Sequence, residues 1–202
     1  MLVTSSHLIG TSVLSLQTGR PIGYISEIIL DPDSLKTVAF RLDGPLVSHS
    51  ANNLLDTKSI REYSNYGMVI DDIEELITDD DVVKISKILA LNFNLIDLKV
   101  ETKKGSKLGK IQDYTLTSED FIVQQIIVKR PPIKAFIDPE LTISRKEIVE
   151  ITDYKVIVRD EEKVLKSRAE KEDFVPNFVN PFRNPEQDFV PADTKTPDAQ
   201  DS

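Results

Sequence analysis

The sequence predicts a mainly β protein: two small β-barrels in tandem, joined by a helical linker and followed by a disordered tail. Three observations support this prediction: an internal repeat, short segments of alternating apolar residues, and an acidic, Pro-rich end. Self-similarity at a nearly fixed spacing indicates a duplicated unit. Alternation with a period of two indicates strands.

The repeat is clearest in a block bounded by glycines. Residues 19–27 match residues 105–113 at an offset of 86, and residues 58–62 match residues 146–150 at an offset of 88. Short insertions between the blocks explain this drift. The expected organisation is a first domain at 5–77, a linking helix at 78–92, a second domain at 93–160, and a short helix followed by the disordered acidic tail at 161–202.

Each copy is predicted to be a series of short strands and tight turns. In the first copy, a strand from Val13 to Leu16 leads into a turn, and a second strand covers residues 22–29. Asp31–Ser34 forms the next turn, and Val38–Leu42 the next strand. The second copy repeats this order. Five or six strands in such a short length favour a small barrel, which leaves few free sheet edges.

The linking segment has the pattern of an amphipathic helix. Val82, Ile85, Ile88 and Leu89 fall on one helical face. The preceding run Asp79–Asp81 is expected to cap the exposed amides of the first turn.

Composition excludes several classes of function. The chain has no Cys, which excludes disulfides, thiolate metal sites and cysteine nucleophiles, and it has only two His residues. No apolar run approaches the ~20 residues that span a bilayer, and the first residues do not resemble a signal peptide, so a cytoplasmic location is expected. The net charge of −9 disfavours nucleic-acid binding over the whole surface, although residues 93–159 carry +2.

The repeated blocks resemble the PRC-barrel family, in which a glycine-bounded strand–turn–strand opens a small β-barrel. Leu16–Asp31 followed by Thr37–Arg41 is similar to that pattern, and Lys104–Asp113 keeps both glycines and the acid. The family includes part of the photosynthetic reaction-centre H subunit, a domain of a ribosome maturation factor, and stand-alone prokaryotic proteins. The resemblance covers about residues 5–160 and implies a protein-binding module with no common catalytic residue.

Four glycines, Gly19, Gly23, Gly105 and Gly109, are expected to serve turns and close packing. Their spacing could suggest a phosphate cradle, but such a cradle needs a strand–loop–helix context that a hairpin lacks.

The acidic runs and the histidines have similarly plain interpretations. Asp79–Asp81 and Asp71–Glu75 lack the spacing of a calcium loop, so capping and a solvated surface are preferred to a metal site. His7 and His49 have no acid fixed beside them in the sequence, so a catalytic triad is not expected. No cofactor, metal or catalytic residue is predicted.

One hairpin of the second copy is basic. Lys103, Lys104, Lys107 and Lys110 are candidates for contacts with phosphates or RNA; Lys99 flanks the same hairpin, and Lys129, Arg130 and Lys134 lie beyond it in the sequence. An ordinary solvated edge, on which lysines discourage aggregation, is the alternative. Apart from Tyr114, this region lacks the interleaved aromatic residues that stack on bases, which favours the solvated edge.

The C-terminal region contains two identical elements, Asp173-Phe-Val-Pro and Asp188-Phe-Val-Pro. Aromatic residues in a Pro-rich acidic segment suggest docking to a groove on a partner, with chance recurrence or packing onto the barrels as alternatives. The candidate docking residues are Phe174, Pro176, Phe178, Phe182, Phe189 and Pro191.

The sequence therefore predicts a non-enzymatic adaptor that binds a protein partner through two barrel surfaces and the tail motifs. The alternative is an RNA-associated or ribosome-assembly factor that uses the basic hairpin.

Overall fold

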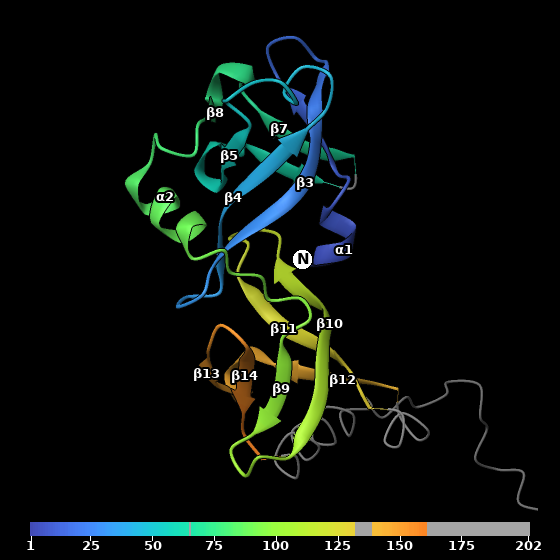
Figure 1. Cartoon of the computed structure of the whole chain (residues 1–202). Helices are drawn as coiled ribbons and strands as arrows, with labels where there is room; N and C mark the ends of the chain where they lie inside the picture. The colour runs from blue at the N-terminus through green and yellow to red at the C-terminus, as the bar shows by residue number, and fades with distance from the viewer. Residues whose placement is uncertain (65, 132–138, 161–202) are drawn as a thin grey trace, which may run out of the picture. The chain divides into compact units, whose positions relative to one another are not determined.

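Two β-sheets dominate the structure, a computed structural model that describes residues 1–64, 66–131 and 139–160 (Figure 1). The first sheet has the strand order β6-β7-β2-β3-β4-β5-β8. The second has the order β12-β11-β10-β9-β14-β13, and β1 also pairs with β10. The predicted mainly β class is confirmed, while the short helix and tail expected at 161–202 lie outside the described residues.

The first sheet consists of β2 (Ser12–Ser15), β3 (Pro21–Asp31), β4 (Lys36–Asp43), β5 (Leu54–Asp56), β6 (Glu62–Ser64), β7 (Gly67–Ile70) and β8 (Leu76–Ile77), with the 3₁₀ helices η1 (Thr57–Ser59) and η2 (Ile73–Glu75). The second consists of β1 (Leu2–Thr4), β9 (Lys99–Thr102), β10 (Lys107–Thr117), β11 (Val123–Lys129), β12 (Glu140–Ser144), β13 (Ile148–Ile151) and β14 (Lys155–Val158), with η3 (Arg145–Glu147). The helices are α1 (Ser5–Leu8) and α2 (Val83–Ala90).

Six strands of the two sheets repeat in the same order, β6-β7-β2-β3-β4-β5 matching β13-β14-β9-β10-β11-β12, while β8 and β1 have no counterpart. β3 and β10 are offset by 86 residues, and η1 and η3 by 88, as in the sequence repeat. In each sheet the strand that begins the repeat pairs in parallel with the second strand of the later hairpin, β2 with β7 and β9 with β14. Register shifts recur as well, between Ile25 and Glu27 in β3 and between Ile111 and Asp113 in β10. Because bulges are position-specific features, the repeat extends to backbone geometry.

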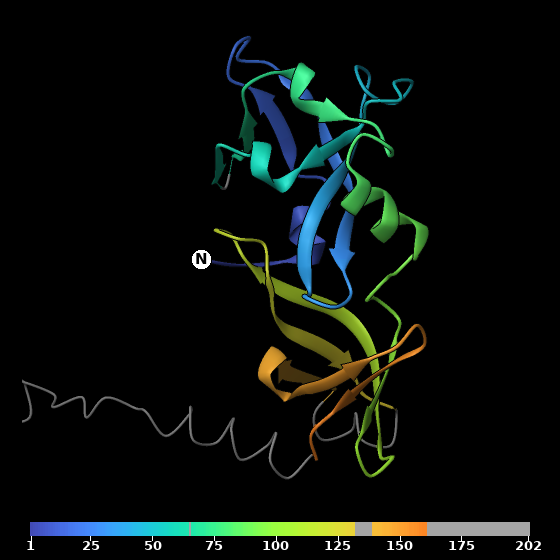
Figure 2. The ribbon, with the colours of Figure 1, turned by 90° about the vertical axis from the view of Figure 1, so that its left-hand side faces the viewer.

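Closure of each sheet into a barrel is not shown. The hydrogen-bonded paths end at β6 and β8 in the first sheet and at β12 and β13 in the second. The long strands β3 and β10 are nevertheless visibly curved (Figure 2). What the structure shows is two curved sheets that share the order of six strands.

One buried apolar cluster contains residues of both sheets, and Phe121 joins them. Its ring meets that of Phe40 edge-on at a centroid distance of 5.2 Å, and that of Tyr63 at 6.2 Å. The Phe121 carbonyl accepts a hydrogen bond from the amide of Thr37 at 2.9 Å. The β10–β11 turn of the second copy is therefore packed into the core of the first.

The first residues of the chain belong to the second sheet. In β1, Leu2 lies opposite Thr117 of β10. The hydroxyl oxygens of Ser5 and Ser6 then lie 2.5 and 2.6 Å from the Asp113 carboxylate oxygens. A sequence scan based on the repeat misses this crossing, because β1 has no counterpart in the other copy.

Helix α2 lies within the expected linking segment and packs on the first sheet. Ile85 and Ile88 are buried against Ile29, Ala39 and Leu54. The expected capping by Asp79–Asp81 is wrong, because the helix starts after Val82 without a side-chain cap. In the described part of the chain, no helix combines the length and apolar character needed to cross a membrane.

Candidate functional site

Three lysines face one another across the second sheet. Lys110 of β10 lies directly opposite Lys99 of β9 on one side and Lys129 of β11 on the other. We call these three residues the lysine row. Like charges at directly opposed positions destabilise a sheet. All three side chains are exposed, and none forms an ion pair with another residue in the described ranges.

A cavity of about 520 Å³ opens beside the lysine row. We call it the lysine cavity. Lys107 and Arg130 add two further cations to its lining. Among the described lining residues Glu101 is the one carboxylate, and it is paired with Lys155 at 3.1 Å. The lining is mainly apolar and includes Val100, Gly109 and Pro131. The cavity therefore combines an apolar interior with an excess of positive charge.

The corresponding positions of the first sheet carry different chemistry. Ser12, Tyr24 and Asp43 lie opposite one another there, where the second sheet has the lysine row. The Tyr24 hydroxyl lies 3.2 Å from the Asp43 carboxylate, and this hydrogen bond raises the pKa of Tyr24. Val47, which is fully buried, packs beside Gly23. The matching residues of the second copy fall at 132–138, outside the described residues.

The predicted glycines occupy two kinds of position. Gly19 and Gly105 lie in hairpin turns with φ of +64° and +82° and open space around them. Gly23 and Gly109 lie within β3 and β10, where a Cβ would stand 2.6 Å from the Asp43 carbonyl oxygen and 2.0 Å from the Lys129 carbonyl oxygen. The first pair serves turn geometry and the second serves close strand packing.

The first copy presents an apolar groove at the end that carries lysines in the second copy. Its volume is about 430 Å³, and Pro21, Ile22, Leu46 and Ile73 line it together with Arg20, Asp72, Ser15 and Thr18. We call it the Leu46 groove. Leu46 is 61% exposed, and neighbouring Leu16 is 66% exposed. At the matching positions, Leu16 and Pro21 become Lys103 and Lys107.

The four lysines of the basic hairpin lie in two different places in the structure. Lys107 and Lys110 line the lysine cavity, whereas Lys103 and Lys104 lie in the β9–β10 turn, where Lys104 pairs with Asp160 at 3.4 Å. Lys129 and Arg130 reach the cavity from β11 and its end, which the sequence alone did not indicate. The repeat could have indicated this pairing. Lys110 and Lys129 lie 86 residues after Tyr24 and Asp43, which pair with each other in the first sheet.

Tyr114 is buried and cannot stack on a base. Tyr114 is only 4% exposed, and its burial raises the pKa of its hydroxyl. Tyr154, in the β13–β14 turn, is 77% exposed, and its carbonyl accepts a hydrogen bond from the Lys99 amide at 3.4 Å. Tyr154 is thus an exposed aromatic residue whose backbone adjoins the lysine row.

His49 lies near a carboxylate and a hydroxyl group, those of Asp43 and Ser48. Asp43 lies close enough to His49 for the imidazole to help lower the carboxyl pKa, although the hydrogen bond from Ser48 is the main cause. The Ser48 hydroxyl is directed to Asp43 and not to His49, so these groups are not ordered as a nucleophilic triad.

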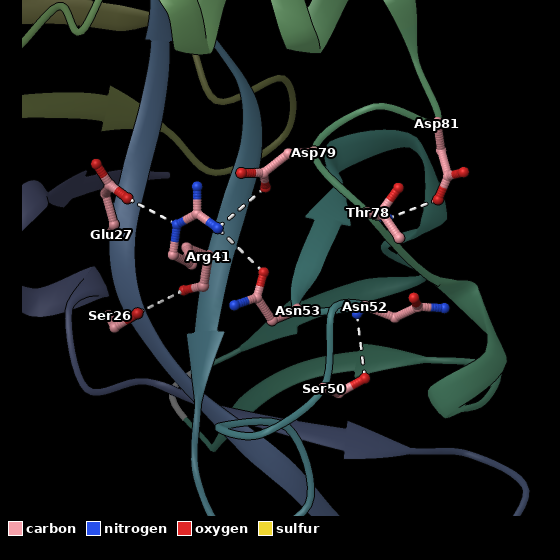
Figure 3. A network of polar contacts seen from close by, with 9 residues as sticks. All are labelled: Ser26, Glu27, Arg41, Ser50, Asn52, Asn53, Thr78, Asp79 and Asp81. Carbon is pink, nitrogen blue, oxygen red and sulfur yellow. Dashed lines mark hydrogen bonds and ion pairs between the residues drawn. The ribbon is translucent and has the colours of Figure 1, made fainter.

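Two of the acidic residues near the linking segment bind the guanidinium group of Arg41 (Figure 3). It donates to Glu27 at 3.0 Å, to Asn53 at 3.0 Å and to Asp79 at 3.1 Å, which ties β3 and β4 to the linking segment. The Asp81 carboxylate accepts from the Thr78 amide at 2.6 Å. Within the ranges that the structure describes, no group of three or more His, Asp or Glu residues is arranged to hold a metal ion.

The predicted docking residues Phe174, Pro176, Phe178, Phe182, Phe189 and Pro191 lie outside the described residues. The described part is thus a duplicated mainly β protein with one cationic and one apolar surface site. Comparison with models of protein families found no match, and comparison with curated proteins found none either.

Proposed function

We propose that this chain is a non-enzymatic adaptor built from two PRC-like barrels, working in the cytoplasm of a prokaryotic cell. The observation that carries the proposal is the contrast between equivalent surfaces. One scaffold occurs twice, yet Pro21 in the Leu46 groove and Leu16 beside it are replaced in the second copy by Lys107 and Lys103. A scaffold repeated with unlike surfaces suits a protein that holds two different binding elements at once.

The Leu46 groove fits a protein segment with one apolar anchor residue. Its volume of about 430 Å³ accommodates a single large side chain and its neighbours. Arg20 and Asp72 at its margin provide one positive and one negative group for the polar residues that flank such an anchor. Exposed apolar side chains next to polar ones are typical of protein interaction sites.

The tail motifs would extend this display. The Phe residues of the two Asp-Phe-Val-Pro elements, Phe174 and Phe189, would each enter an apolar groove on a partner, and two motifs on one chain raise apparent affinity for a multivalent partner.

The test uses two exposed leucines of matched exposure. Leu46 and Leu91 are each 61% exposed, but only Leu46 lines the groove. Leu46→Asp should abolish capture of a specific protein from native lysate, and Leu91→Asp should leave it intact. Equal capture by both variants would show that the groove does not carry the interaction.

The second candidate function is RNA association, and exposed Tyr154 beside the lysine row is the observation that favours it. Stacking and phosphate contacts together are the usual means of binding single-stranded RNA. This function predicts salt-sensitive RNA binding that is lost when Lys103, Lys104 and Lys107 are replaced.

A further inference from the structure

We propose that the lysine cavity is a binding site for an acidic, aromatic peptide, and that its occupant is an Asp-Phe-Val-Pro element of the chain's own C-terminal segment. This inference goes beyond the proposed function, because it concerns a site on the second copy and requires no external partner.

The first argument is the clustering of like charge. Lys99, Lys110 and Lys129 are held directly opposite one another, and among the described residues that line the cavity the only carboxylate is already engaged by Lys155. An anionic ligand would relieve this repulsion. An acidic side chain placed among these lysines would be bound by several of them at once.

The second argument is the apolar lining. A site for a simple anion or for RNA phosphates would be polar throughout, but this cavity is lined mainly by apolar atoms and has a volume of about 520 Å³. That space accommodates a phenyl ring together with a Val or Pro side chain. The element Asp-Phe-Val-Pro supplies an anion, an aromatic ring and two further apolar residues in four consecutive positions.

The third argument is where the described chain ends. Asp160 is paired with Lys104, and the Val158 carbonyl accepts from the Lys103 amide at 3.0 Å, so the chain leaves from the same hairpin that carries Lys107. Twelve residues, 161–172, separate this point from Asp173. Tethering on such a length gives an effective concentration of about 1 mM. A motif with a Kd of about 0.1 mM would then occupy the site about 90% of the time.

An external partner that binds the same element would compete with the cavity. Residues 160–202 carry a net charge of −5, so the segment as a whole is attracted to the second copy, whose residues 93–159 carry +2. The cavity would hold the motif until a partner of higher affinity removes it.

The test is the reactivity of lysine amines in the full-length protein, measured by low-dose acetylation and mass spectrometry. Phe174→Ala with Phe189→Ala should raise the reactivity of Lys99, Lys110 and Lys129 by up to about tenfold. Phe178→Ala with Phe182→Ala removes two Phe residues of the same segment and should change nothing. Lys58, whose side chain is 88% exposed in the first copy, is the internal reference.

A synthetic Asp-Phe-Val-Pro peptide added to the first double variant should restore the protection, and the same peptide with Ala for Phe should not. Equal reactivity in the wild type and both double variants would overturn the proposal. Protection that disappears on tenfold dilution would overturn its intramolecular form by assigning the motif to a second copy. Protection that appears only after RNA is added would overturn it in favour of nucleic-acid binding.

Discussion

At the residue scale, the repeated glycines are needed for two physical reasons: a positive φ and the close approach of a neighbouring strand. Gly19 and Gly105 are needed for left-handed backbone in turns, and Gly23 is needed because a neighbouring carbonyl lies where a Cβ would be; Gly109 meets both requirements, since its φ is +148°. The sequence predicted turn and close-packing roles for the set. It could not assign each role, because the close approach depends on a register shift that the sequence does not reveal.

Gly109 should tolerate substitution far less than Gly105. Gly109→Ala forces a Cβ to within 2.0 Å of the Lys129 carbonyl oxygen, so we expect the free energy of unfolding to fall by about 3 kcal/mol or more. Gly105→Ala meets no atom within 4 Å and should cost about 1–2 kcal/mol for its positive φ. Urea unfolding of both variants measures the difference; equal losses would contradict the close-packing role.

Asp113 should make stability depend on pH. Burial by itself would raise the pKa of this carboxyl, but hydrogen bonds from Ser5 and Ser6 outweigh it and lower the pKa. A lowered pKa in the folded state contributes stability above the unfolded value, near pH 4, and that contribution is lost as the pH falls through the folded value.

Asp113→Asn should therefore reduce the melting temperature at pH 7, and its effect should shrink as the pH falls below about 4 and through the folded-state pKa, where the wild-type carboxyl becomes protonated as well. Circular dichroism melts of both proteins across this range test it. A difference in melting temperature that stays constant with pH would show that the carboxylate charge is not what holds α1 to β10.

At the scale of elements, strands were more predictable than connections. The alternation of apolar residues placed both long hairpins correctly, because each hairpin buries one face of its strands. The pairing of β1 with β10 was missed, since a three-residue strand has too little alternation to be recognised. The start of α2 was misplaced, because Asp79 pairs with Arg41 and Asp81 caps an earlier turn.

Contacts of its buried face with the first sheet should provide most of the free energy that holds helix α2 in place. Ile85 is 3% exposed against the first sheet, and Ile85→Ala should lower the free energy of unfolding by about 2–4 kcal/mol. Val83 is 68% exposed on the same helix, and Val83→Ala should change it by less than about 0.5 kcal/mol. Chemical denaturation distinguishes them. A small loss in the first variant would mean that α2 detaches at little cost.

At the scale of the whole molecule, the duplication was evident from the sequence, but the shared core was not. Phe121 is an ordinary apolar residue in sequence, and only its turn geometry places it against Phe40 and Tyr63 of the other copy. The residues of the lysine cavity were only partly brought together by the sequence. Lys107 and Lys110 were assigned to one basic hairpin, whereas Lys129 lies beside Lys110 because β11 pairs with β10.

The shared core predicts that both copies unfold together. The described chain should show one cooperative transition, and Phe121→Ala should lower the free energy of unfolding by about 3–5 kcal/mol or separate the transition into two. Tyr66→Ala, at a position 90% exposed, is the control and should leave the curve unchanged. Calorimetry tests this; two transitions already present in the wild type would contradict the coupling.

The most direct measurement of the adaptor function is site-specific photocrosslinking in cells, with a photoreactive residue at position 46 and, as the matched control, at position 91. The proposed function predicts a discrete protein adduct from position 46 that is absent from position 91. Identical adducts at both positions, or adducts to nucleic acid alone, would contradict it.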